Sequence, residues 1–181
     1  VGRRPNTDHL GLQAAGIATD SRGFITVDDQ LRSNVPGVWA LGDANGRGAF
    51  THTAYNDFEI VAANLLDDGQ RSVNDRIPAY ALFIDPPLGR VGMSEAQVRA
   101  TGRPALVGVM PMSRVGRAKE RGETQGFMKV LVDSQTERIL GASLLCIEGD
   151  EIVHSLLDVM AANASYRVVQ RAVHIHPTVS E

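Results

Sequence analysis

The pattern of hydrophobic and polar positions changes near residue 76, and it predicts two regions of different build. Residues 1–35 are rich in turn-forming residues and predict only a short helical stretch at 10–15 and a strand at 23–27. The apolar run at residues 38–41, "VWAL", predicts a buried strand that ends at a Gly-Asp turn. The first region is therefore expected to contain little regular structure before its main helix.

That helix is predicted to begin at Thr51 or Thr53, either of which could cap it, and to end near Gly69. Its buried face is predicted from apolar residues at i, i+3, i+4, i+7 spacing, which are Phe58, Val61, Ala62 and Leu65. The polar stretch 67–78, "DDGQRSVNDRIP", follows the helix, and we place a domain boundary near residue 76. The expected domains are residues 1–75 and residues 76–181.

The second region has the pattern of an antiparallel sheet with helices, so its expected class is α+β. Strands are predicted at residues 79–84, 105–110, 127–132 and 138–146, with the turn "DSQTE" between the last two. Ser94 and Gln97 form a capping-box pattern for a short helix that ends at Gly102. Further helices are predicted at residues 150–162, on Ile152, Leu156, Val159 and Met160, and at residues 166–173, capped by Ser165.

Composition changes this picture little, since 43% hydrophobic and 22% charged residues are ordinary for a globular protein. The formal net charge of −3 gives no basic excess that would favour nucleic acid or anionic lipid. No apolar run is long enough to span a bilayer and no signal-peptide pattern opens the chain, so a cytoplasmic location is expected. The chain begins without methionine, and we expect it to be a piece of something longer.

Two features have simple interpretations. The one cysteine, Cys146, lies in the apolar run "ILGASLLC", which favours a buried and inert thiol over a nucleophile. The cations of "SRVGRAKERGE" are expected in a solvated loop, with a phosphate or nucleotide site as the alternative; they are Arg114, Arg117, Lys119 and Arg121.

The turn after "WAL" is the first place where the sequence suggests a ligand. Gly42 would permit close approach of a ligand at the end of a strand, and Asp43 could accept hydrogen bonds from sugar-type hydroxyls. The helix that begins at Thr51 to Ala54 would offer backbone N–H groups and the positive end of its dipole. An aspartate that merely caps its own loop is the alternative interpretation.

The C-terminal stretch "AVHIHPTVSE" is the second such place. Proline after His176 disfavours a helical backbone at that histidine, so the ring lies on an extended or turn segment. A turn through Pro177, with a helix start at Thr178 or Ser180, could bring Glu181 back to the imidazole. A carboxylate on one ring nitrogen fixes the tautomer and raises the basicity of the other nitrogen, as in a general acid/base.

Other interpretations of the tail remain open from the residues alone. "HIH" places His174 and His176 on one side of an extended strand, as in some metal-dependent hydrolases, although zinc would need a third ligand. A buried structural histidine is the third interpretation.

Taken in order, these motifs resemble the C-terminal part of the class I pyridine nucleotide-disulfide oxidoreductases, the family of dihydrolipoamide dehydrogenase, glutathione reductase and mercuric reductase. The resemblance covers nearly the whole chain. "VGRRPNTDHLGL" is similar to the exit from the NAD(P) domain, and "ITVDDQLRSNVPGVWALGD" to the second FAD segment. "PPLGRVGMSEAQ" and "GFMKVLVDSQTERILGASLL" resemble the interface, or dimerisation, domain, and "HIHPTVSE" its catalytic tail.

The resemblance implies a role for each candidate residue. Gly42 and Asp43 stand at the signature positions, with Asp43 bonded to the ribityl chain of FAD. The backbone of Thr51, His52, Thr53 and Ala54 would face the pyrimidine edge of the flavin. His176 would be the acid/base and Glu181 its orienter, serving the partner subunit of a homodimer, with a cis His-Pro bond. No metal site is expected.

Departures from the family pattern narrow the choice of activity. Mercuric reductases carry a paired-cysteine tail and lack the tail histidine, so "HPTVSE" argues against mercury reduction. "FTHTAYNDFEIV", "FIDPPLGRVGM" and "LGASLLC" most resemble the mercuric-reductase-like bacterial subgroup, which is related to the copper-active reductase of reactive-chlorine resistance. The substrate is expected to be a small-molecule disulfide or a metal ion.

The chain lacks a G-x-G-x-x-G motif and paired redox cysteines, which the resemblance assigns to an N-terminal part. We therefore expect the C-terminal fragment of an FAD-dependent NAD(P)H oxidoreductase, inactive alone, with NAD(P)H bound by the N-terminal part. A stand-alone dimerisation module without catalysis is the alternative, and a metal-dependent hydrolase that uses "HIH" is a third hypothesis.

Overall fold

The computed structural model describes residues 2–181, and Val1, the first residue of the predicted 1–75 segment, lies outside them. The chain divides into two compact units, Val1–Arg76 and Ile77–Glu181. Each unit has its own hydrophobic core, and each is described by itself below. None of the helices in residues 2–181 is long and apolar enough to cross a membrane.

The first unit is built mostly from loops. Its helical elements are η1 (Gly42–Asn45), α1 (Thr51–Leu66) and η2 (Val73–Asp75). The helix predicted at residues 10–15 is wrong, because this stretch forms consecutive turns between Gly11 and Gly16, which both have positive φ. The predicted strands at 23–27 and 38–41 are also wrong, since within residues 2–76 each makes only one isolated β-bridge.

Helix α1 begins at Thr51, one of the two predicted starts, but neither predicted threonine is its N-cap. Phe50 takes that place, and Thr53 Oγ1 lies 3.1 Å from the Phe50 amide and 2.7 Å from the Phe50 carbonyl. The predicted buried face is wrong, because Phe58 and Leu65 are each 53% exposed. The helix instead buries Asp57 and Ile60, and Ile60 joins a small core of Ile25, Val27, Leu31 and Ala40.

The segment after α1 runs back along that helix and is bonded to it. Asn64 Nδ2 donates to the Arg71 carbonyl, and the Arg71 amide donates to Asn64 Oδ1, both over 2.8 Å. Asn74 Nδ2 donates to Asp29 Oδ2 over 2.7 Å, and the Val73 amide donates to the Asp29 carbonyl over 2.9 Å. Residues 67–76 are thus a folded part of the first unit, which ends at Arg76, where the boundary was placed.

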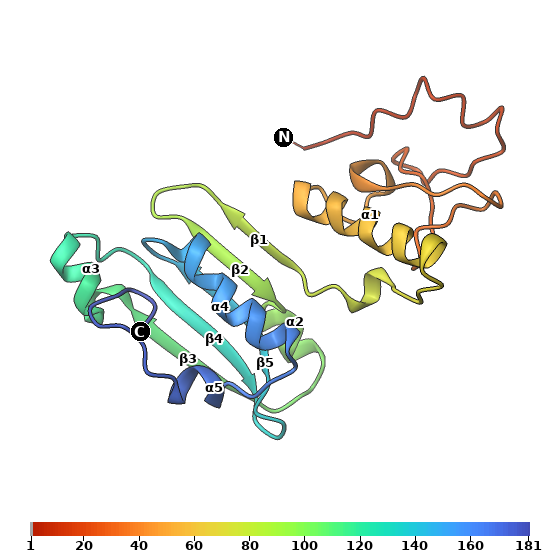
Figure 1. The fold of residues 1–181 in the computed structure, drawn as a ribbon. Helices are drawn as coiled ribbons and strands as arrows, with labels where there is room; N and C mark the ends of the chain where they lie inside the picture. The colour runs from red at the N-terminus through yellow and green to blue at the C-terminus, as the bar shows by residue number, and fades with distance from the viewer. Residues whose placement is uncertain (1) are drawn as a thin grey trace. The chain divides into compact units, whose positions relative to one another are not determined.

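The second unit is an antiparallel sheet with strand order β1-β2-β5-β4-β3 (Figure 1), which confirms the predicted α+β class. The strands are β1 (Ala79–Leu82), β2 (Leu88–Gly92), β3 (Ala105–Pro111), β4 (Phe127–Asp133) and β5 (Ile139–Leu145). Strand β2 was not predicted, because the glycines and the arginine in "LGRVG" hide the alternation of a strand. Strand β1 also ends two residues before its predicted limit.

Four helices accompany the sheet: α2 (Glu95–Ala100), α3 (Gly116–Arg121), α4 (Gly149–Ala161) and α5 (Arg167–Arg171). The Ser94–Gln97 capping box is confirmed, and α2 ends at Ala100, two residues before the predicted Gly102, which has φ of 69°. Helix α3, preceded by η3 (Met112–Arg114), replaces the loop predicted for the basic cluster. The N-cap of α5 is Tyr166 and not the predicted Ser165, although Ser165 Oγ accepts from the Arg167 amide over 3.2 Å.

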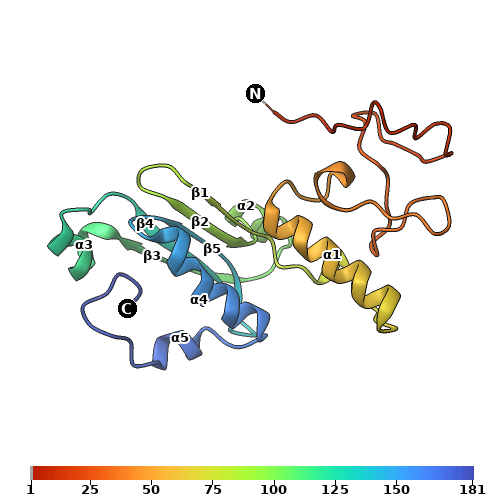
Figure 2. The ribbon, with the colours of Figure 1, turned by 45° about the horizontal axis from the view of Figure 1, so that its top comes forward.

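Helix α4 lies across one face of the sheet (Figures 1 and 2), and glycine makes that approach possible. A Cβ on Gly89 of β2 would stand 2.1 Å from the Gly149 carbonyl oxygen at the start of α4. Val91, Leu144 and Val153 share the core beneath the helix. On the other face, Val98 of α2 packs with Leu131, as the alternation of a strand requires.

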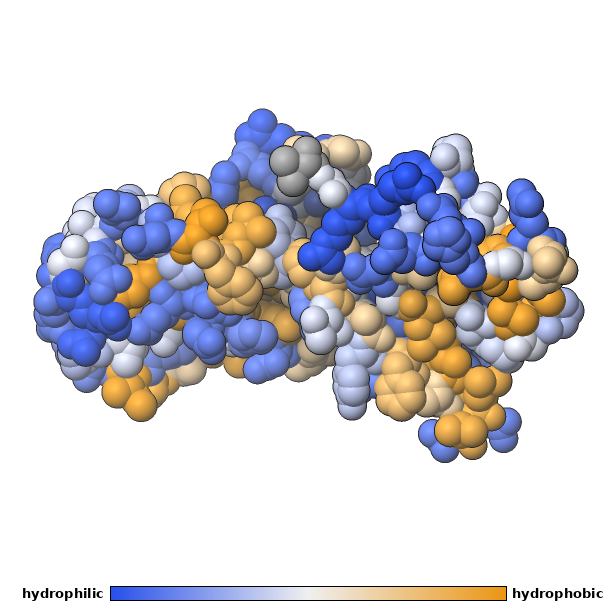
Figure 3. Space-filling model, turned by 90° about the horizontal axis from the view of Figure 1, so that it is seen from above, coloured by the Kyte–Doolittle hydropathy of each residue, from blue (hydrophilic) through white to orange (hydrophobic). Residues whose placement is uncertain are grey.

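Apolar side chains also remain on the surface of both units, and the face drawn in Figure 3 carries several hydrophobic patches between hydrophilic regions. In the first unit they include Tyr55, Phe58 and Leu66, and in the second Phe83, which is 86% exposed. Patches of this kind are typical of surfaces that contact another protein segment.

Candidate functional site

The Gly42–Asn45 loop packs directly on the first turn of α1. Gly42 has φ of 70°, and a Cβ built on it would lie 3.3 Å from the Ala54 Cβ, so glycine suits both the backbone and the packing. Asp43, the next residue, has a half-exposed side chain, and Arg3 Nη1 donates to its Oδ2 over 3.0 Å. The structure therefore brings together the Gly-Asp turn and the helix start that were predicted to share a site.

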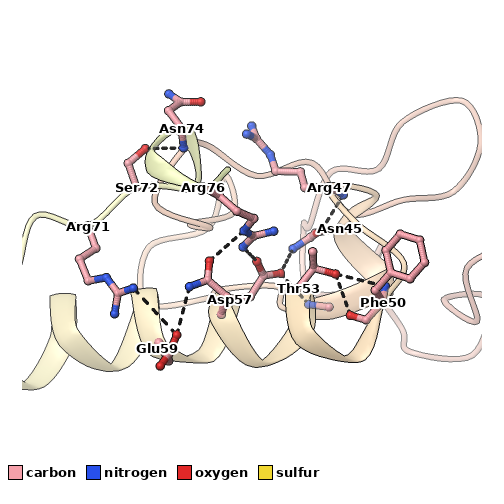
Figure 4. Close-up of polar contacts among 12 residues, drawn as sticks. Asn45, Arg47, Phe50, Thr53, Asp57, Glu59, Arg71, Ser72, Asn74 and Arg76 are labelled. Atoms are coloured by element: carbon pink, nitrogen blue, oxygen red, sulfur yellow. Dashed lines mark hydrogen bonds and ion pairs between the residues drawn. The ribbon is translucent and has the colours of Figure 1, made fainter. Parts of the chain in front are cut away.

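A buried carboxylate holds this loop (Figure 4). The side chain of Asp57 is 3% exposed, and its Oδ2 accepts from the Gly42 amide over 2.9 Å and from Asn45 Nδ2 over 2.8 Å. Its Oδ1 accepts from Arg76 Nη2, so the negative charge has a cation beside it. Asn45 Nδ2 also donates to the Ala40 carbonyl over 3.0 Å, which ties the loop to the chain that enters it.

The N-terminus of α1 presents Thr51, His52, Thr53 and Ala54 beside the loop. Phe50 and His52 stack, with ring centroids 5.3 Å apart. The positive end of the helix dipole lies in this turn, and Thr51 and His52 are exposed. A cavity of about 300 Å³ adjoins Asp43 and is lined by Arg3, Arg4, Pro5, Phe24, Asp43, Gly46, Gly48 and Ala49.

The C-terminal tail folds the predicted pair together. His176 Nδ1 lies 3.0 Å from Glu181 Oε1 and 2.9 Å from Oε2, and the His176–Pro177 bond is cis. The helix start predicted at Thr178 or Ser180 is wrong, because residues 172–181 contain no helix; the Thr178 hydroxyl instead donates to the Ile175 carbonyl over 2.8 Å.

A buried valine anchors this turn. Val179 is buried in the core with Met112, Val115 and Ala118, from η3 and the adjoining α3. The turn is thereby fixed at Val179, while the side chain of His176 remains 76% exposed. Within residues 2–181 the ring forms no hydrogen bond at Nε2, so that nitrogen is available to a reacting group.

The structure also bears on the other interpretations of the histidines and the cysteine. His174 is exposed and takes no part in the His176–Glu181 pair. Among the described residues, no three His, Cys, Asp or Glu side chains stand close enough to hold a metal ion. Cys146 is fully buried, and burial, with the nearby carboxylates of Asp150 and Glu148, raises the pKa of its thiol to about 11. The prediction of an inert thiol agrees with this environment.

Comparison with known proteins places these features in context. The family pattern described as "Pyridine nucleotide-disulphide oxidoreductase, dimerisation domain" matches residues 78–181, and the one described as "Pyridine nucleotide-disulphide oxidoreductase" matches residues 1–57. The chain belongs to the pyridine nucleotide-disulphide oxidoreductase family. It corresponds to the C-terminal portion of that family, as its motifs predicted.

Relatives in this family match nearly the full chain. The "Probable pyridine nucleotide-disulfide oxidoreductase RclA" of Escherichia coli K12 is 40% identical over 182 residues, which cover 99% of this chain and 41% of that protein. The "Dihydrolipoyl dehydrogenase" of Cupriavidus necator is 36% identical over 100% of this chain and 38% of its own length.

Among solved structures, the "Cu(II) complex of HOCl-induced flavoprotein disulfide reductase RclA from Escherichia coli" superposes with a TM-score of 0.93 at 39% identity, covering 99% of this chain and 42% of that one. The chain thus spans about two fifths of the length of the relatives it matches.

Sequence reasoning missed the residues that hold the Gly-Asp turn in place. Asn45, Asp57 and Arg76 form the buried network around Gly42, yet none was a candidate. The only available signal was Asp57 itself, an acidic residue three positions before Ile60, on the face that turned out to be buried. Hydrophobic periodicity pointed to the opposite face because Phe58 and Leu65 are large and apolar.

Proposed function

We propose that the chain is the C-terminal part of a homodimeric, FAD-dependent NAD(P)H oxidoreductase that reduces a small-molecule disulfide or a metal ion. In this proposal the first unit contributes flavin contacts, and the second contributes the dimer interface and a His/Glu acid–base pair. The observation that carries it is the pairing of His176 Nδ1 with Glu181 at 2.9 Å beside an exposed imidazole.

The residues of the first unit fit a flavin cofactor. The half-exposed carboxylate of Asp43 accepts hydrogen bonds, as the hydroxyls of a ribityl chain require. The loop that follows Asp43 packs closely at two glycines. A Cβ on Gly46 would stand 3.0 Å from the Phe24 ring, and one on Gly48 would stand 2.8 Å from Thr53. The start of α1 offers N–H groups and a positive dipole end to an electron-rich ring edge.

When bound, FAD would accept hydride from NAD(P)H and pass electrons to the substrate. The proposed contribution of the second unit is proton transfer at His176. A carboxylate at Nδ1 holds the ring with the proton on that nitrogen, so Nε2 is the acceptor that faces outward. We propose that this nitrogen takes and returns the proton of a thiol in the partner subunit of the dimer.

The substrate class rests on two further observations. Solved structures similar to this chain include those of a flavoprotein disulfide reductase, and one of them is a Cu(II) complex of that protein. Within the present chain, the one thiol is buried with a raised pKa and is unsuited to redox exchange. We therefore propose that the thiols that would meet His176 belong to the part of the protein N-terminal to this chain.

The test is His176→Ala in the holoenzyme that contains this chain. Flavin reduction by NAD(P)H, followed by stopped-flow absorbance, should be nearly unchanged, whereas the dithiol half-reaction should slow about a hundredfold. His174→Ala is the matched control, because it removes an exposed imidazole two residues away that does not pair with Glu181. Equal loss in both half-reactions, or an equal effect of the two variants, would contradict the proposed role of His176.

A further inference from the structure

Asp57 is placed to control the geometry of the Gly-Asp turn without touching a ligand itself. Its carboxylate accepts from the Asn45 side chain (Figure 4) and from the Gly42 amide, and these two residues lie on either side of Asp43 in the chain. Both bonds go to the same oxygen, Oδ2, at 2.9 Å and 2.8 Å. Any movement of that oxygen therefore moves both ends of the short segment that carries Asp43.

The other oxygen of Asp57 is held from a different part of the chain. Arg76 Nη2 donates to Oδ1, and the Arg76 side chain is itself only 14% exposed. Its Nε donates to Asn56 Oδ1 over 2.8 Å, so the guanidinium is fixed against α1 in two places. A buried carboxylate without such a cation would be strongly destabilised.

A neutral side chain at position 57 could make the same bonds to the loop. If asparagine replaced Asp57, its oxygen could occupy the Oδ2 position and accept from both Gly42 and Asn45. Its amide nitrogen could then donate toward a glutamine oxygen at position 76 through a water, because glutamine is shorter than arginine. The ability to hold the loop can thus be separated by mutation from the charge of the pair.

We propose that Asp57 is a positioning residue of the flavin site, which holds the Gly42–Asn45 loop so that Asp43 meets the ribityl chain, with Arg76 as its counter-ion. This inference rests on the proposed function. It adds two residues, from α1 and from the segment that precedes the second unit, to those that determine FAD affinity.

Two double variants in the full holoenzyme provide the test, with FAD affinity measured by fluorescence titration of the apoprotein. Asp57→Asn with Arg76→Gln keeps a hydrogen-bonded network, and FAD affinity should stay within about threefold of wild type. Asp57→Leu with Arg76→Met removes the acceptor without leaving a buried charge, and affinity should fall about tenfold or more. Glu59→Gln, a carboxyl-to-amide change on the same helix, is the control and should leave affinity unchanged.

A second readout does not depend on the cofactor. In the apoprotein, hydrogen exchange at the Gly42 amide should be slow in wild type and in the Asn/Gln pair, and at least tenfold faster in the Leu/Met pair. In combination with Asp43→Asn, the Leu/Met pair should weaken FAD binding by less than the product of the two separate effects, because both act through the same contact.

The outcomes are decisive in each case. Equal FAD affinity of the two double variants would overturn the positioning role. If the Leu/Met pair does not fold, Asn45→Ala keeps the ion pair and removes the bond to Asp57 together with the Asn45 bonds to the Ala40 carbonyl and the Arg47 amide; unchanged FAD affinity in that variant would equally overturn the positioning role. A wild-type protein that binds no FAD would refute the proposed function instead, and Gly42 exchange would still show whether Asp57 holds the loop.

Discussion

Each of the two units of this chain is stabilised by a different kind of interaction. The second unit has a regular antiparallel sheet, and apolar side chains pack against it on both faces. The first unit has one long helix and a small apolar core, and its loops are tied by side-chain hydrogen bonds around Asp57, Asn45 and Asp29. One unit is therefore stabilised mainly by packing and the other largely by a few specific polar partners.

This difference has a consequence for mutations. An apolar core spreads its free energy over many contacts, so the cost of a substitution depends on the volume that it changes. A buried polar network concentrates free energy in few bonds, and removal of one partner leaves another buried group unsatisfied. The first unit should thus be most sensitive at charged positions, and the second at positions of close backbone approach.

The largest effect is expected for Arg76→Met in the first unit. This change leaves the carboxylate of Asp57 buried without its cation, and the unit should lose about 3–5 kcal/mol of stability. Hydrogen exchange at α1 amides would report the loss separately from the sheet of the second unit. Arg71→Met is the control, since its ion pair with Glu59 is exposed and 3.9 Å long, and it should cost less than about 1 kcal/mol.

A somewhat smaller effect is expected for Gly89→Ala in the second unit. The new methyl group would stand 2.1 Å from the Gly149 carbonyl oxygen, so α4 must move off the sheet. We expect the free energy of unfolding of the second unit to fall by about 2–3 kcal/mol, measured by urea titration with hydrogen exchange at β5 amides as the readout. Gly108→Ala is the control, because a Cβ at Gly108 would lie 4.0 Å from its nearest neighbour, the Val130 carbonyl oxygen. A comparable loss of stability in that variant would mean that close approach is not the cause.

The smallest effect concerns acid stability of the second unit. Hydrogen bonds from Arg167 lower the pKa of Glu137, with smaller contributions from the charges of Arg167 and Arg171. A lowered folded-state pKa gives stability that is complete above the unfolded value of about 4.3 and is lost as pH falls through the folded value.

Glu137→Gln should therefore be less stable than wild type at pH 7, and the difference should shrink below about pH 4. Thermal unfolding at a series of pH values measures this. Glu120→Gln, on the exposed pair with Arg117, should change stability little at pH 7. A Glu137→Gln deficit that persists at low pH would point to lost packing rather than lost charge.

The same contrast explains how far the fold could be predicted. Strands β3, β4 and β5 alternate apolar and polar or run continuously apolar, and helix α4 has a clear apolar stripe, so local pattern sufficed. Strand β2 was not predicted because glycine is required at position 89 by the close contact with α4, and a tertiary requirement of this kind does not follow the local pattern. In the first unit, turns at Gly11 and Gly16 overrode the helical pattern of residues 10–15.

The candidate site divides in the same way. The approach of Glu181 to His176 could be foreseen, because proline fixes the local backbone and only five positions separate the two residues. The support of Asp43 could not be foreseen, since Asp57 and Arg76 lie 14 and 33 positions further along the chain. Such long-range polar pairs leave no periodic signal in the sequence.

The bonds between residues 67–76 and helix α1 also predict where this chain could be recombined with another protein. A chimera that joins its dimerisation domain to another protein at residue 67 would separate Asn64 from Arg71 and remove the guanidinium that neutralises Asp57. A junction between Arg76 and Ile77 keeps both sets of contacts on one parent. Recombination should therefore tolerate a crossover at the last residue of this segment far better than one at its polar, turn-rich beginning.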